Sequence, residues 1–154
     1  MKTIHDVASY IASRYKNEFR TKIDEMKLHK LMYFAQRESY VLYDEPLFDG
    51  TFYGWKYGPV LKEVRQLYKE NDLTFSGTAD ENLQKIMDRI FDRYAEKTSW
   101  SLSRLTHGEY SWQNSRKGIP ENTNGDNPIK NDDIIKDAER IKTRINLFSS
   151  SIDQ

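Results

Sequence analysis

The side chains that most often perform acid–base or metal chemistry are few and scattered in this chain. The three histidines, His5, His29 and His107, lie far apart, and none has a second histidine or a carboxylate at the spacing of a metal motif. His107 is the best catalytic candidate, because Thr106 and Glu109 lie beside it and a catalytic histidine needs an oriented nucleophile or acid. Such neighbours are common, so we interpret His107 as a residue that binds the last carbonyls of a helix, and His29 as a structural or surface residue.

No other motif supports enzymatic chemistry. The chain has no cysteine, which excludes disulfides and thiolate metal sites. Its glycines are too scattered for a phosphate-binding loop, and no GxSxG nucleophile motif is present. The sequence therefore predicts a protein that is not an enzyme and that holds no metal and no cofactor. A cryptic hydrolase that uses His107 is the alternative.

The charge balance argues against general binding to nucleic acid. Lys plus Arg and Asp plus Glu each number 24, so the formal net charge is zero, whereas nucleic-acid binders usually carry a basic excess. One helix face could read DNA, but such a stripe is more often solvated. It consists of Lys62, Arg65, Gln66 and Lys69. Nucleic acid is not the expected partner, and a DNA-binding regulator stays as an alternative.

Aromatic residues are abundant, with ten Tyr, seven Phe and three Trp. They could fill a core that is poor in aliphatic residues, or form a protein interface, where Tyr and Trp are enriched. No apolar run approaches the ~20 residues of a membrane span, and the N-terminus lacks the apolar stretch of a signal peptide. We therefore expect a cytoplasmic protein with no membrane partner.

The apolar spacing predicts the mainly α-helical fold that must position these residues. The expected helices cover residues 3–17, 24–43, 59–70, 78–94, 98–107, 111–117 and 132–148. The second is apolar on most of its circumference and should be central to the core. Residues 46–57 predict a short β-hairpin or an ordered aromatic loop, and residues 117–131 predict the most mobile loop. The prediction is a single compact domain of about six to seven helices around a central apolar helix, residues 1–148, with a frayed tail, residues 149–154.

Single residues predict where three of these helices begin. Pro59 is expected at the first position of the third helix, because its φ is preset and it lacks an N–H that would otherwise be unpaired. Thr78 and Glu81 are expected to form a capping box for the fourth helix. Ser111 is expected to cap the short helix that follows Gly108.

Three stretches, taken in order, carry a resemblance to one family. They are residues 27–36 (KLHKLMYFAQ), 47–60 (LFDGTFYGWKYGPV) and 102–112 (LSRLTHGEYSW), with Arg116 beyond. Together they resemble the Panacea domain, the family of phage-associated GepA-like proteins and the SocA-like protease adaptor, over about residues 4–145. Gly54 stands where the family often has Ala, and Ser111 stands where it often has Pro.

This resemblance implies a bacterial antitoxin that neutralises a cognate protein toxin, encoded by a neighbouring gene, through direct binding. One branch of the family instead delivers its toxin to the Clp protease, so a protease adaptor is an alternative. The shared motifs do not define the partner, and the surface that selects the toxin should lie outside them. The sequence leaves the oligomeric state open.

Nine residues of the shared motifs form the candidate site. They are Lys30, Tyr33, Trp55, Tyr57, Gly58, Pro59, Thr106, His107 and Trp112. We expect the rings of the turn at residues 55–59 to pack against the helix end at His107 and against Trp112. Gly58 should allow a close approach or an unusual backbone angle, with Lys30 and Tyr33 beneath. The cluster is either a structural lock for the aromatic loop or the lining of a partner-binding groove.

Overall fold

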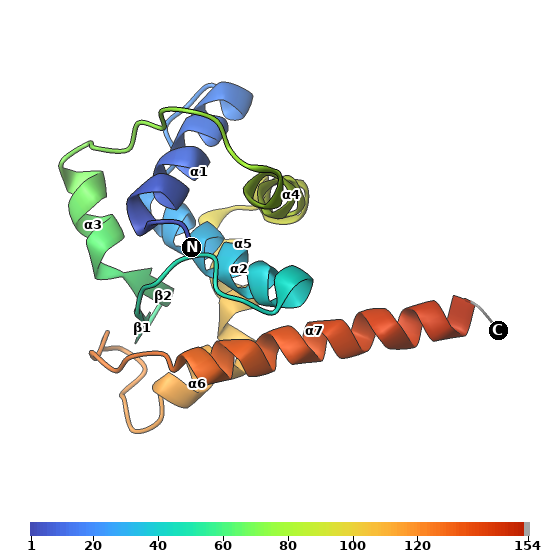
Figure 1. The fold of residues 1–154 in the computed structure, drawn as a ribbon. Helices are drawn as coiled ribbons and strands as arrows, with labels where there is room; N and C mark the ends of the chain where they lie inside the picture. The colour runs from blue at the N-terminus through green and yellow to red at the C-terminus, as the bar shows by residue number, and fades with distance from the viewer. Residues whose placement is uncertain (153–154) are drawn as a thin grey trace.

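Helix α2, Glu25–Tyr43, lies at the centre of the structure, a computed structural model that describes the backbone of residues 1–152 and the side chains of residues 1–148. Every residue of α2 from Lys27 to Tyr40 is buried. Five other helices, α1, α3, α4, α5 and α7, pack against it (Figure 1). The carboxylate of Asp24 caps its first turn by accepting from the backbone N–H of Lys27 at 2.8 Å.

The remaining elements complete a helical domain with one hairpin. They are α1 (Ile4–Phe19), β1 (Phe52–Trp55), β2 (Gly58–Leu61), α3 (Lys62–Lys69), α4 (Glu81–Ile90), a π-helical turn (Phe91–Ala95), α5 (Ser99–His107), α6 (Tyr110–Ser115) and α7 (Asn131–Ile152). Seven α-helices within residues 1–152 confirm the expected mainly helical single domain around a central helix. The antiparallel pairing of β1 with β2 forms a hairpin that begins inside the expected segment, residues 46–57, and ends beyond it at Leu61.

Two predicted helix starts are wrong. Pro59 lies in β2, opposite Gly54, and α3 begins only at Lys62. A two-stranded ribbon consists of edge strands alone, and an edge strand tolerates a residue that cannot donate to the ladder. Helix α4 begins at Glu81, where Asp80 accepts from the N–H of Leu83 at 2.8 Å and caps the helix in place of the expected Thr78.

The segment between α6 and α7 is tied to the hairpin. The backbone N–H of Ile129 donates to the carbonyl of Phe52 at 2.7 Å, and the N–H of Gly54 donates to the carbonyl of Asn127 at 3.0 Å. The guanidinium of Arg116 donates to four carbonyls, those of Gly54, Pro120, Thr123 and Asn124, at 2.6 to 3.0 Å. The planar guanidinium of Arg116 thus organises the loop that the sequence predicts to be the most mobile.

Helix α7 packs its first half against α2 and α6, and its second half extends past the rest of the molecule (Figure 1). It continues to Ile152, beyond the expected helix end at Phe148. The last two residues of the expected tail lie outside the described residues. No helix in the described part of the chain has the length and apolar character needed to span a membrane.

Candidate functional site at the hairpin turn

The turn between β1 and β2 contains only Lys56 and Tyr57, since Trp55 pairs directly with Gly58. Gly58 has φ +129°, a conformation that residues with a Cβ rarely adopt. A Cβ at this position would lie 2.8 Å from Oγ1 of Thr106 and 3.3 Å from Cε of Lys30. Gly58 is therefore the point where the hairpin meets both the end of α5 and the central helix.

Helices α5 and α6 hold the turn by its main chain. The hydroxyl of Ser103 donates to the carbonyl of Tyr57 at 2.9 Å, and the indole N–H of Trp112 donates to the carbonyl of Trp55 at 2.8 Å. The hydroxyl of Thr106 is occupied within α5, where it donates to the carbonyl of Ser103 at 2.9 Å. These bonds fix the position of the turn without using the side chains of Trp55 and Tyr57.

His107 stacks on Trp112, with ring centroids 4.1 Å apart and an angle of 12° between the planes. Its ring lies beside the backbone of Lys56, and its Nε2 is buried without a partner among the described residues. Burial lowers the pKa of His107 below its ordinary value, so the ring is neutral at pH 7. The expected bond to the last carbonyls of the helix is thus replaced by the stacking contact with Trp112.

The rings of Trp55 and Tyr57 lie against residues other than the expected His107 and Trp112. The guanidinium of Arg65, on α3, lies 5.1 Å from the ring centroid of Trp55. The ring of Tyr57 faces Trp100, with centroids 6.1 Å apart. Tyr57 is 42% exposed and Trp100 66% exposed, which is unusual for side chains of this size. Sequence reasoning missed Trp100, because it lies outside the three shared motifs and only the fold brings it beside Tyr57.

Lys30 and Tyr33 are both buried, but they contact different parts of the protein. Lys30 is 1% exposed and lines a pocket beside the turn. Tyr33 lies one turn further along α2, where its hydroxyl donates to Asp137 at 3.1 Å and lies 2.7 Å from Oγ of Ser111. Burial raises the pKa of Tyr33 well above its ordinary value, which keeps this hydroxyl a donor. The structure therefore separates Tyr33 from the rest of the candidate cluster.

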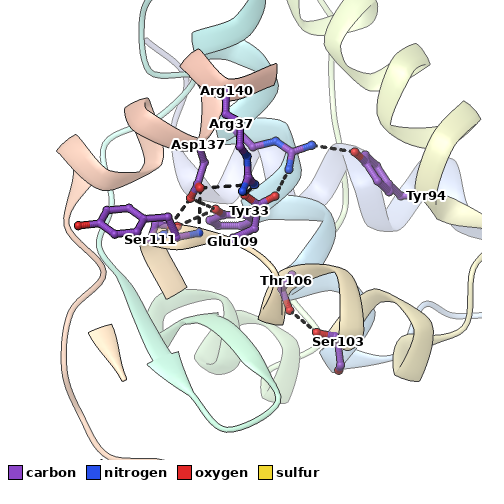
Figure 2. A network of polar contacts seen from close by, with 10 residues as sticks. Tyr33, Arg37, Tyr94, Ser103, Thr106, Glu109, Ser111, Asp137 and Arg140 are labelled. Atoms are coloured by element: carbon purple, nitrogen blue, oxygen red, sulfur yellow. Dashed lines mark hydrogen bonds and ion pairs between the residues drawn. The ribbon is translucent and has the colours of Figure 1, made fainter. Parts of the chain in front are cut away.

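Around Tyr33 lies a buried ionic network that the sequence did not reveal (Figure 2). Arg37 forms an ion pair with Glu109 and donates to the hydroxyl of Tyr94 at 2.8 Å. Arg140 donates to the second oxygen of Glu109 at 3.0 Å. Burial raises the pKa of Glu109 to about 7, although the two arginines act to lower it. The alternating charges bind α2, α6 and α7 together.

Asp137 supplies the cap that α6 lacks. Its two carboxylate oxygens accept from the backbone N–H groups of Tyr110 and Ser111, each at 2.9 Å. Glu109, the residue before α6, makes no capping bond of its own. The expectation that Ser111 caps this helix is wrong, because its hydroxyl pairs with Tyr33.

Two pockets flank the turn, and Lys56 lines both. The smaller, of about 170 Å³, lies between α2, the hairpin and α3, and includes Lys30, Trp55 and Arg65. The larger, of about 470 Å³, includes His107, Trp112 and Arg116. Within the described residues, no group of three or more His, Asp or Glu side chains could hold a metal ion.

His29 and the face of α3 that was considered for DNA binding both contact other parts of the protein. The buried His29 lies 2.9 Å from Glu25 through Nε2, and its Nδ1 accepts from the N–H of Leu61 at 3.3 Å. On the face considered for DNA, three side chains have acidic neighbours. Lys62 pairs with Asp126, Arg65 pairs with Glu25 and Gln66 donates to Glu70, at 2.8, 3.1 and 2.7 Å. These contacts reduce the basic character of that face.

Comparison with known protein families shows which family the chain belongs to. The sequence model of the antitoxin SocA-like Panacea domain matches residues 28–113, more than half of the chain. The protein therefore belongs to the SocA-like Panacea antitoxin family, which implies a cognate toxin as partner. No curated protein and no solved structure matches the chain. The matched region contains the hairpin and the whole candidate cluster, whereas α1 and α7 lie outside it.

Proposed function

We propose that this protein is an antitoxin that neutralises its toxin by direct binding, with Tyr57 and Trp100 as anchors of the interface. The observation that carries the proposal is the exposure of these two large rings side by side on a rigid support. Aromatic side chains dominate the binding energy of protein interfaces. A ring that is already held in place also loses little entropy on binding.

The motif residues divide between two roles in this proposal. Gly58, Thr106 and Trp112 fix the turn, which corresponds to the structural lock. Tyr57 is presented to solvent by that lock and corresponds to the partner-binding surface. Trp100 lies outside the three shared motifs, as expected of a residue that selects a particular toxin.

The test is co-expression with the neighbouring gene, followed by affinity purification. The toxin alone should stop growth, and the native antitoxin should restore it and co-purify with the toxin in a fixed ratio. Trp100→Ala and Tyr57→Ala should each weaken binding by at least about tenfold, as expected for interface hot spots, with the unfolding midpoint unchanged for Trp100→Ala. Leu105→Ala, which also removes an exposed apolar side chain from α5, serves as the control.

Two outcomes would reject direct neutralisation through this surface. Growth that is restored only when Clp is present, with loss of the toxin protein, would indicate a protease adaptor. Full toxin binding by a Trp100→Ala, Tyr57→Ala double variant would place the interface elsewhere.

A further inference from the structure

The pocket of about 170 Å³ beside the turn is lined by two residues whose side-chain donors have no acceptor among the described residues. Among the described residues, the ammonium of Lys30 makes no hydrogen bond and no ion pair, although the side chain is 1% exposed. The indole Nε1 of Trp55, which lines the same pocket, is buried and also without a partner. Buried donors of this kind are costly unless something accepts from them.

Lys27 shows how a buried lysine on the same helix is normally accommodated. It lies one turn before Lys30, and its ammonium donates to the hydroxyl of Tyr15 at 3.2 Å and to the carbonyl of Ala95 at 3.0 Å. Lys30 has no equivalent acceptors. Burial lowers the pKa of Lys30 to about 8, and attraction to Asp24 only partly opposes this shift. The difference identifies Lys30 as a cation that residues 1–148 leave unpaired.

The charges around the pocket favour an anion. Lys30, Lys56 and Arg65 line it, and no acidic side chain does. The nearby carboxylate of Glu25 is occupied by His29 at 2.9 Å and by Arg65 at 3.1 Å. Asp24 accepts from the N–H of Lys27 and from the hydroxyl of Ser99. Among the described residues, no carboxylate forms an ion pair with Lys30.

The pocket opens next to the proposed toxin interface. Tyr57 lines the pocket and is also the exposed partner of Trp100. A protein that covers the two rings would bring its own side chains to the mouth of the pocket. Such a side chain could supply the missing acceptor.

We propose that the pocket formed by Lys30, Trp55 and Lys56 receives the carboxylate of an Asp or Glu side chain of the bound toxin. The carboxylate forms an ion pair with Lys30 in the pocket that Trp55 also lines. This inference rests on the proposed function, because the toxin supplies the side chain. It adds a charge requirement to the selection that Trp100 contributes at this interface.

The first experiment tests the pocket without the toxin. Sodium acetate serves as the carboxylate probe, and the indole N–H resonance of Trp55 is followed by NMR, with assignment by Trp55→Phe. A saturable shift is expected for the native protein, and none for Lys30→Met or for sodium chloride at equal ionic strength. A native protein that does not respond to acetate overturns the inference.

The second experiment tests the occupant in the complex. Lys30→Met should weaken toxin binding by about tenfold to a hundredfold, as expected for the loss of a charge-assisted hydrogen bond. The control, Lys85→Met, removes an equal charge from the exposed side of α4 and should bind as the native protein does. Each Asp and Glu of the toxin is then neutralised in turn, and one of them should show no further loss in the Lys30→Met background.

These results separate the two proposals. If the native protein does not bind the toxin at all, the proposed function fails, while the acetate response still reports on the pocket. If the toxin binds but no toxin carboxylate is coupled to Lys30, the inference is overturned and the antitoxin function stands.

Discussion

The hydroxyl of Tyr33 on the central helix meets the carboxylate of Asp137 on the last helix at 3.1 Å, inside the protein. The same carboxylate accepts from the first two backbone N–H groups of α6. One buried side chain thus joins three helices, two of which approach α2 from distant parts of the sequence (Figure 2). Its removal should affect stability more than that of any other acidic residue of α7.

We expect Asp137→Ala to lower the free energy of unfolding by about 3–5 kcal/mol, the usual cost of breaking a buried charged network. The variant leaves the N–H groups of Tyr110 and Ser111 without an acceptor. Urea denaturation measures the loss. Asp132→Ala, which removes an exposed carboxylate from the first turn of α7, should change stability by no more than about 1 kcal/mol. Equal effects of the two substitutions would show that the network does not stabilise the fold.

The two buried lysines of α2 should respond in opposite ways to the same substitution. Lys27→Met removes a donor from the hydroxyl of Tyr15 and the carbonyl of Ala95, and should cost about 1–3 kcal/mol at pH 7. Lys30→Met removes a buried ammonium that has no partner, and should leave stability unchanged or raise it. Thermal unfolding of both variants under the same conditions checks the contrast. A large loss of stability in Lys30→Met would indicate that its ammonium is paired in the native state.

The lowered pKa of Lys30 predicts a particular dependence on pH. The folded protein releases this proton near pH 8, whereas the unfolded chain releases it near 10.5. Between these values the unfolded state binds more protons, so the stability of the native protein should rise with pH relative to that of Lys30→Met. Subtraction of the Lys30→Met profile removes the contributions of the tyrosines and the other lysines. A difference that stays flat from pH 8 to 10.5 would contradict the prediction.

Gly58→Ala should be strongly destabilising for two reasons. The backbone has φ +129°, and the new Cβ would lie 2.8 Å from Oγ1 of Thr106. Gly77→Ala is the matched control, because Gly77 also has a positive φ but no atom within 4 Å of a new Cβ. Backbone strain alone costs about 1–3 kcal/mol, so Gly58→Ala should exceed Gly77→Ala in unfolding experiments. Thr106→Ala should recover part of the excess in a double variant, and no recovery would mean that the close approach is not the cause.

Local patterns in the sequence were sufficient for the helices and for strand β1, whereas most of β2 lies in residues that were assigned to a helix. The central helix, α2, was predictable because apolar residues cover most of its circumference. Strand β1 was predictable because strand-prone residues are interrupted by glycines. The starts of α3 and α4 were predicted incorrectly. In each case a neighbouring element, the β2 strand or the Asp80 cap, competed for the same residues.

The contacts of the site were less predictable than the residues that form it. No local pattern marks Asp137 as a cap, and only the packing of α7 on α6 shows that it caps another helix. The pairing of Tyr57 with Trp100 depends on where α5 lies relative to the hairpin. Neither relationship has a local signal, because each joins side chains at least 26 residues apart, a separation given by Ser111 and Asp137.

The cap that Asp137 provides has a consequence for how this protein could be dissected or recombined. The region that matches the family ends within α6, while the acceptor for the start of that helix lies on α7, beyond the match. We therefore expect the smallest part of the chain that folds to extend beyond the matched residues 28–113. A chimaera that exchanged only the shared module between two antitoxins would separate α6 from its carboxylate, so a working transplant must carry α7 with it.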